Sequence, residues 1–206
     1  MADSTPVKLA VLVSGNGTNL QAVIDRIEAR EINARIECVV SNRQDAFALK
    51  RAAQHGIPAV VLEVGAHADR RAYDAALVGI LRDHGVQLVI LAGFMRILTD
   101  VMIDAFPHAI MNIHPALLPA FPGLHAQRQA LGYGVRYSGC TVHFVDAGTD
   151  TGPIILQAAV PVLADDTEET LSARIQQEEH RIYPEAVRLF CAGKIRVDGR
   201  RVRILS

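Results

Sequence analysis

An amide and an imidazole stand two residues apart in the segment Ile110–Pro119, at Asn112 and His114. The apolar neighbours of Asn112 predict a buried strand that ends at His114, because the prolines Pro115 and Pro119 oppose a following helix. Alternate side chains of a strand share one face, so the two polar groups should project together. A capped strand with a surface histidine is the structural alternative. The pairing of an amide donor with a proton carrier favours a functional site.

A second polar segment, Asp146–Pro153, follows a predicted strand and contains two glycines and two aspartates. Aspartate commonly caps tight turns, which is the expected role of Asp146. If this loop faces His114, the carboxylate of Asp150 stabilises the charged imidazole and keeps an acid available near neutral pH. His143, among apolar residues of the preceding strand, is expected to be a core histidine or a support for the site.

Near the N-terminus, a predicted strand runs into Gly15-Asn16-Gly17-Thr18-Asn19 and then into an amphipathic helix. This order presents backbone N–H groups and a positive helix end to an anion. Leu20 stands where a dinucleotide-binding motif requires a third glycine, so a single phosphate fits better than a pyrophosphate. A tight turn capped by asparagine explains the same residues equally well.

Two further charged residues lie in apolar surroundings. Arg96 lies in the apolar segment Gly93–Leu98. Either its guanidinium only reaches solvent, or it binds the acidic group of a flat ligand whose ring lies in an apolar slot. Arg70 is either a second cation for that ligand or a surface charge. Glu179 falls on the buried side of a predicted long helix, one turn after Gln176. These two side chains either bind an amine or hydroxyls, or lie at a helix edge in water.

The elements that position these residues alternate along the chain. Strands are predicted at 8–14, 34–41, 57–62, 88–91, 110–114, 137–145 and 154–162, with helices at 20–27, 45–55, 69–84, 101–106 and 126–131. A last helix begins at a capping box in 166–169 and is kinked or divided by Pro184, and a hairpin follows at 194–204. The rhythm predicts an α/β fold, a parallel sheet with helices on both faces. Right-handed crossovers place the strand carboxyl ends at one edge, where the candidate residues should converge.

The composition fits one soluble domain. The 206 residues carry a formal net charge of −1, so no overall field attracts nucleic acid or an anionic membrane. No apolar run is long enough to span a bilayer, and residues 1–6 lack a secretory signal. The three cysteines are widely spaced, so neither a zinc site nor a disulfide framework is expected and a cytoplasmic location fits.

Six motifs, in this order, resemble those of the phosphoribosylglycinamide formyltransferases, which are folate-dependent enzymes. They are Ser14–Leu20, Ala92–Leu98, Asn112–Pro115, Pro122–His125, Asp150–Pro153 and Gln176–His180. The resemblance extends from Lys8 to at least Phe190. It implies the formyltransferase fold: a Rossmann-like, mostly parallel twisted sheet in a single domain over residues 1–206. The Rossmann-like half is expected at about 7–106, and the catalytic loops, later strands, long helix and hairpin at about 107–206.

The resemblance also implies an activity and its residues. The expected reaction transfers the formyl group from 10-formyltetrahydrofolate to the amine of glycinamide ribonucleotide (GAR), in purine biosynthesis, by direct acyl transfer without a metal. The implied catalytic residues are Asn112, His114 and Asp150. The implied GAR-binding residues are Gly17, Thr18, Asn19, Leu20, Gln21, Gln176, Gln177, Glu178 and Glu179. The implied folate-binding residues are Arg70, Met95, Arg96, Ile97, Leu98, Asn112, Asp146, Ala147, Gly148, Thr149 and Asp150.

Other functions share part of this pattern. Methionyl-tRNA formyltransferase has the same Asn-x-His and Asp chemistry but an additional C-terminal nucleic-acid-binding domain, and formyltetrahydrofolate hydrolase has an additional N-terminal regulatory domain; neither is expected here. A non-catalytic nucleotide-binding module would keep the glycine loop without needing Asn112, His114 and Asp150 together. The apolar pattern does not separate an oligomer interface from the core, so the oligomeric state stays open.

Overall fold

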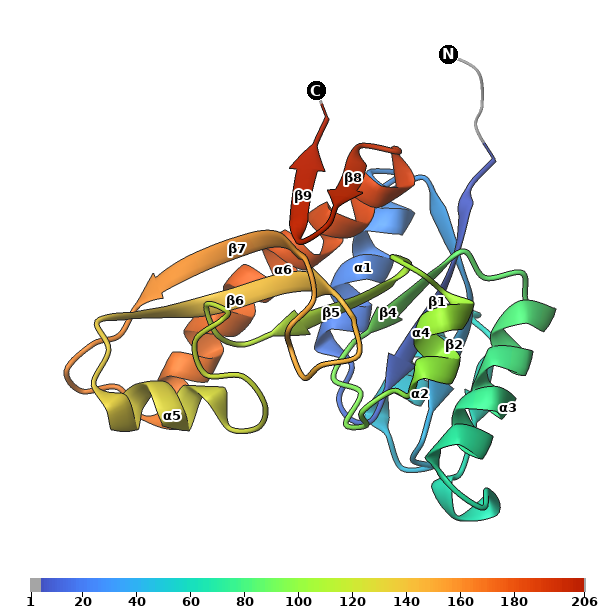
Figure 1. Cartoon of the computed structure of the whole chain (residues 1–206), viewed down its shortest axis with the longest axis horizontal. Helices are drawn as coiled ribbons and strands as arrows, with labels where there is room; N and C mark the ends of the chain where they lie inside the picture. The colour runs from blue at the N-terminus through green and yellow to red at the C-terminus, as the bar shows by residue number, and fades with distance from the viewer. Residues whose placement is uncertain (1–4, 206) are drawn as a thin grey trace.

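A computed structural model describes residues 5–205, and these form a single nine-stranded sheet flanked by helices (Figure 1). The strand order is β3-β2-β1-β4-β5-β6-β7-β9-β8. The strands are β1 (Val7–Val13), β2 (Ala34–Ser41), β3 (Ala59–Val61), β4 (Leu88–Leu91), β5 (Ile110–His114), β6 (Tyr137–Phe144), β7 (Ile154–Pro161), β8 (Ile195–Asp198) and β9 (Arg201–Ile204). The helices are α1 (Thr18–Glu28), α2 (Phe47–Gln54), α3 (Arg70–Asp83), α4 (Asp100–Ala105), α5 (Ala126–Tyr133) and α6 (Glu168–Cys191), with a short 3-10 turn at Val64–Ala66.

The first five strands in spatial order, β3-β2-β1-β4-β5, are parallel, which confirms the predicted β-α-β-α half. The direction reverses after β5, since β6 pairs antiparallel with β5 and β7 antiparallel with β6. With β7 and β9 again parallel, five of the eight strand pairings are parallel, which confirms the predicted mostly parallel sheet. One sheet runs through both halves of the chain, so the division near residue 106 stays a prediction.

Alternating side chains of the central strands pack into two separate apolar layers. Leu9 and Val11 of β1 contact the layer that α1, α2 and α6 cover, whereas Ala10 and Leu12 contact the layer that α3 and α4 cover. In Figure 1, α3 and α4 lie on one side of the sheet, away from α1 and α6. The prediction of helices on both faces is confirmed, and both faces of β1 are buried, as its continuous apolar sequence requires.

The long helix α6 differs from the prediction in two details. It is one continuous helix through Pro184, so of the two predicted effects of this proline, a kink or a division, the division is wrong. Its capping box joins Thr167 to Thr170, whereas the prediction used the acidic residues of the segment. The buried residues Leu171, Ile175 and Ile182 follow the predicted inner face. The C-terminal hairpin is confirmed as β8 and β9, with β8 at the edge of the sheet.

Candidate active site

His114 and Asp150 meet at the carboxyl end of β5. The Nδ1 atom of His114 lies 3.3 Å from Oδ2 of Asp150, and its Nε2 lies 2.8 Å from the carbonyl oxygen of Phe121. His114 is only 4% exposed. A carbonyl oxygen only accepts, so Nε2 carries a proton, and a carboxylate faces the other nitrogen. Both ring nitrogens of His114 therefore face acceptors, and Asp150 is the carboxylate that the sequence placed beside this imidazole.

Asn112 is connected to the His114–Asp150 pair through His143. The antiparallel register of β5 and β6 places Asn112 opposite His143, and the Nδ2 group of Asn112 lies 3.2 Å from Nε2 of His143. His143 Nδ1 donates to the carbonyl of Phe144, and its Nε2 faces the Asn112 amide. His143 Nε2 is also 3.7 Å from Oδ1 of Asp150. His143 therefore supports the site, as one of its two predicted roles.

Asp150 is held as an anion. Burial raises the pKa of its carboxyl, but the His143 ring, the backbone N–H of Gly123 and the charge of His114 outweigh that effect, so its pKa lies below the ordinary value. The Gly123 N–H donates to Oδ2 at 2.8 Å. Asp150 has a φ of 55°, a left-handed conformation that non-glycine residues rarely adopt. Such a strained backbone is typical of functional loops.

A buried threonine, which the sequence analysis did not single out, fixes the loop after His114. Thr141 lies opposite His114 in the β5–β6 register, and its Oγ1 donates to the carbonyl of Ala116 and accepts from the N–H of Leu118. Gln157 of β7 donates to Thr141 Oγ1 and to the Leu118 carbonyl. The signal for Thr141 was a polar residue inside an apolar strand.

The glycine loop packs against α2 so closely that it admits no side chain at Gly17. Gly17 has a φ of 68°, and a Cβ atom there would lie 2.6 Å from the Cβ of Ala48. Helix α1 begins at the next residue, Thr18, and no side chain caps its start. Its first N–H groups therefore have no partner within the helix, which is the anion-binding arrangement predicted from the sequence.

Helix α6 closes this loop from the other side. Asn19 Nδ2 donates to Oε2 of Glu179 at 3.0 Å, and Gln176 Nε2 donates to Oγ1 of Thr18 at 3.2 Å. Glu179 is 9% exposed, so the alternative of a helix edge in water is wrong. Burial raises the pKa of the Glu179 carboxyl, and the bond from Asn19 opposes that rise.

The remaining residues predicted to bind GAR differ in their burial and in their contacts. Leu20 is buried in the core, and the side chain of Gln21 is half-buried against α2. Gln177 is exposed, and Glu178 forms an ion pair with Arg181. Only Thr18, Asn19, Gln176 and Glu179 are brought into mutual side-chain contact between the loop and α6.

A pocket of about 490 Å³ is lined by Arg70, Met95, Arg96 and Ile97, with part of the segment Val64–Asp69. Met95 and Ile97 are exposed apolar side chains, whereas Leu98 is buried in the core. The Arg96 guanidinium lies 4.3 Å from the centre of the Tyr73 ring, and its Nε is buried without a hydrogen-bond partner among the described residues. This favours the apolar slot with a cation over an arginine that only reaches solvent.

The loop at Asp146 keeps its structural role. Asp146 accepts from the Gly148 N–H and from the Thr151 hydroxyl, as predicted for a turn cap. Ala147, Gly148 and Thr149 are exposed beside Asp150. Within residues 5–205 no three His, Cys, Asp or Glu side chains are grouped as metal ligands. None of the described helices is long and apolar enough to cross a membrane.

One buried tyrosine connects the two halves of the site. The hydroxyl of Tyr183 lies 2.9 Å from the carbonyls of Leu91 in β4 and Met111 in β5. It stands one turn after Glu179 on α6, so it fixes this helix against the strand that carries Asn112. Burial raises the pKa of the Tyr183 hydroxyl well above its ordinary value, so the group remains a donor. The sequence analysis did not single out Tyr183, although its position on the inner side of α6 could have indicated it.

Comparisons with known proteins agree on one family. The family described as "Formyl transferase" matches residues 7–187. The phosphoribosylglycinamide formyltransferase of Escherichia coli is 43% identical over 203 residues, covering 95% of this chain and 96% of the relative. The trifunctional purine biosynthetic protein adenosine-3 of Drosophila melanogaster is 48% identical over 90% of this chain, which spans only 14% of that relative's length.

Solved structures give the same result. Glycinamide ribonucleotide transformylase 1 from Symbiobacterium toebii superposes with a TM-score of 0.97 at 56% identity, covering 98% of this chain and 96% of that one. A formyltetrahydrofolate deformylase from Pseudomonas syringae superposes with a TM-score of 0.92 at 25% identity, covering 99% of this chain but 67% of its own. A transformylase and a deformylase therefore share this fold, so the fold by itself does not distinguish these two activities.

Proposed function

The chain belongs to the formyl transferase family, and from this premise we propose that it transfers the formyl group of 10-formyltetrahydrofolate to the amine of GAR. The products are formyl-GAR and tetrahydrofolate, in de novo purine biosynthesis. The observation that carries the proposal is the position of His114 between Asp150 and the Phe121 carbonyl, with Asn112 on the same face of β5. We further propose that the protein acts in the cytoplasm and needs no metal.

Asn112 and His114 act on the formyl oxygen. As the GAR amine forms its bond to the formyl carbon, the carbonyl electron pair moves to the oxygen. The Asn112 amide donates to that developing oxyanion, and the nearby His114 imidazolium, whose N–H groups face Asp150 and the Phe121 carbonyl, stabilises it by its positive charge in a largely buried site. Asp150 holds the imidazolium in its protonated form and in its orientation.

His114 and Asp150 also move the protons that the reaction releases and takes up. When the carbonyl re-forms, the bond from carbon to the folate nitrogen breaks and that nitrogen takes up a proton. The attacking amine, after bonding, must lose one. The His114–Asp150 pair can pass this proton directly or through water, so the enzyme ends each turnover in its starting state.

Binding of GAR is assigned to the contact between the glycine loop and α6. The uncapped start of α1 offers N–H groups to the phosphate, and Thr18 and Gln176 stand beside it. The Glu179 carboxylate suits the hydroxyls or the amine of the substrate. Folate is assigned to the pocket at Met95–Ile97, because apolar side chains fit its flat ring and Arg70 and the Arg96 guanidinium fit its acidic end.

The test is a spectrophotometric assay with purified protein, a 10-formyl-folate and GAR. Formyl transfer should require GAR and should disappear in His114→Ala. His84→Ala is the matched control. This histidine lies at the C-terminal end of α3, whereas Arg70 of the pocket lies at its start, so the variant should retain the wild-type rate. Deformylation that proceeds equally without GAR would indicate a hydrolase instead, and the glycine loop would then need another role.

A further inference from the structure

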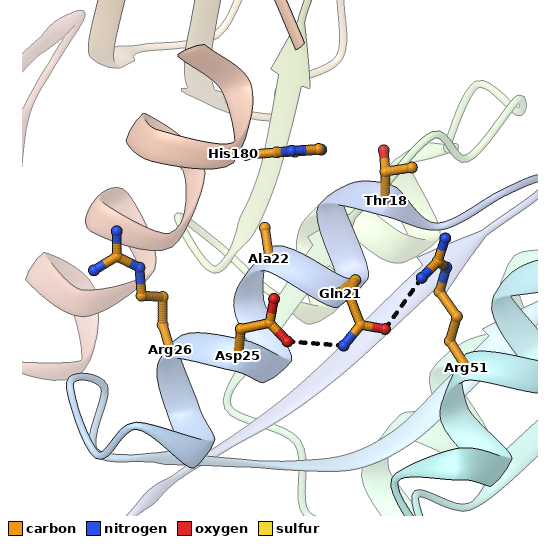
Figure 2. Close-up of a pocket in the computed structure, with 7 residues that line it drawn as sticks. All are labelled: Thr18, Gln21, Ala22, Asp25, Arg26, Arg51 and His180. Atoms are coloured by element: carbon orange, nitrogen blue, oxygen red, sulfur yellow. Dashed lines mark hydrogen bonds between the residues drawn. The ribbon is translucent and has the colours of Figure 1, made fainter. Parts of the chain in front are cut away.

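A pocket of about 300 Å³ lies beside the glycine loop, along helix α1 (Figure 2). One face of α1, from Thr18 to Arg26, forms its floor, and Arg51 of α2 and His180 of α6 form its walls. Thr18 belongs both to this pocket and to the loop, so the pocket opens onto the start of α1. None of the residues predicted for the GAR site supplies a positive charge.

Arg51 is attached to the loop at two points. Its Nε donates to the backbone carbonyl of Asn16 at 2.8 Å, and its Nη1 donates to Oε1 of Gln21 at 3.2 Å. The guanidinium also lies 5.1 Å from the centre of the Phe47 ring. A half-buried arginine with three such contacts loses little further freedom when it binds a ligand.

The amide of Gln21 is itself oriented by two neighbours. Its Nε2 donates to Oδ1 of Asp25 and lies 3.1 Å from Nε2 of His55, which leaves Oε1 for Arg51. His55 is held in turn by Glu28. Figure 2 shows Gln21 between Asp25 and Arg51, so the acid does not contact the guanidinium.

Arg51 is the cation of this pocket that lacks an acidic partner. Arg26 forms an ion pair with Glu31, whereas no ion pair within residues 5–205 includes Arg51. Its Nη2 group has no hydrogen-bond partner in this part of the chain. Burial lowers the pKa of His180, so that imidazole adds no charge at neutral pH.

An uncapped helix start and an unneutralised guanidinium thus lie next to each other. We propose, on the basis of the proposed function, that Arg51 binds the phosphate of the ribonucleotide substrate and makes the enzyme specific for the phosphorylated form. The Nη2 group donates to a phosphate oxygen while the first N–H groups of α1 donate to the others. The contacts to Asn16 and Gln21 hold the guanidinium in place before the substrate arrives.

The test compares GAR with its dephosphorylated nucleoside in wild type, Arg51→Gln, Arg51→Lys and Lys50→Gln. Lys50 is the matched control, because it lies on the same helix with its Nζ 5.7 Å from the Phe47 ring and does not line the pocket. In Arg51→Gln, KM for GAR should rise about tenfold, the weight of one partly exposed charged hydrogen bond, with kcat unchanged. Activity with the nucleoside should not change, Arg51→Lys should recover part of the preference, and Lys50→Gln should match wild type.

Two results would overturn the assignment. One is an equal loss with both substrates in Arg51→Gln and Arg51→Lys, since that would give Arg51 only a structural role in the loop. The other is an unchanged preference for GAR in Arg51→Gln. A wild-type protein without GAR-dependent transfer would instead overturn the proposed function itself, so the two failures are distinguishable.

Discussion

The side chains of Asn19 and Glu179 are 160 residues apart in sequence and form a hydrogen bond of 3.0 Å. This bond joins the loop at the start of α1 to the middle of α6. It also gives the buried Glu179 carboxylate a donor, which a buried charge requires. One turn further along α6, Tyr183 bonds to the carbonyl before Asn112, so the glycine loop and strand β5 are fixed to the same helix.

Replacing Asn112 by alanine should lower kcat about 10²–10³-fold, the usual weight of one oxyanion donor. The KM for GAR should change little, because this amide contributes mainly after the amine attacks. Steady-state kinetics with both substrates measure the effect, and thermal unfolding confirms that the variant is folded. A turnover number equal to that of wild type would contradict the role of Asn112.

Replacing Asp150 by asparagine should lower kcat about 10²–10⁴-fold, because His114 loses the carboxylate that favours its protonated form. The wild-type pH profile gives a second measure. Since the pKa of Asp150 lies below its ordinary value, protonation of this carboxyl should not limit activity until the pH falls below about 3.9. An acid limb near pH 6 that persists in a His114 variant and is lost in Asp150→Asn would show that Asp150 titrates there instead.

The same depressed pKa predicts how stability changes with pH. The ionised Asp150 stabilises the folded state above the unfolded pKa, and this contribution is lost as the pH falls through the lower folded pKa. Asp150→Asn should therefore be less stable than wild type at pH 7. Urea unfolding at several pH values should show the difference shrinking below pH about 3.9.

Glu179→Gln should separate stability from binding. The raised pKa of Glu179 means that its ionised form destabilises the fold; this cost is absent below the unfolded pKa and complete above the folded one. A glutamine keeps an oxygen for Asn19 without the charge. The variant should be at least as stable as wild type at pH 8, with a smaller advantage at pH 4, while KM for GAR rises about 10–100-fold. A destabilised variant with unchanged KM would reverse both assignments.

The two glycines of the loop give a matched pair for the close approach to α2. Gly17→Ala should destabilise the protein by about 1–3 kcal/mol, because it combines a left-handed φ with a contact to Ala48 that is too short. Gly15 has open space around it and no positive φ, so Gly15→Ala should leave the free energy of unfolding nearly unchanged. Urea denaturation compares them, and equal losses would mean that flexibility of the loop matters rather than space.

Two hydroxyls of β6 give a matched pair for the loop after His114. Thr141→Val removes bonds to Ala116 and Leu118 and should cost about 1–3 kcal/mol while also lowering kcat. Ser138 is buried on the same strand, but its Oγ has no hydrogen-bond partner within the described part of the chain. Ser138→Ala should therefore be neutral in both measurements. A Thr141→Val enzyme with the wild-type kcat would show that the loop holds His114 without this threonine.

The sequence determined the local features. Apolar periodicity and turn residues predicted the strands and helices, with 34–41 and 88–91 at their observed bounds, since both signals act over a few residues. The two-residue spacing of Asn112 and His114 placed them on one face of β5, and the glycine loop indicated a phosphate. The pattern also singled out Asp150 as a possible partner of His114 and Glu179 on the buried side of the long helix, and the resemblance added their expected roles.

Only the tertiary structure decided which distant groups meet. The reversal of direction at β6 sets His143 against Asn112 and Thr141 against His114, and the following loop brings Asp150 to His114. The packing of α6 across α1 buries Glu179 beside Asn19, and that of α2 brings Arg51 to the loop. Strand order and helix packing depend on the burial of whole apolar faces, and no short stretch of sequence contains that information.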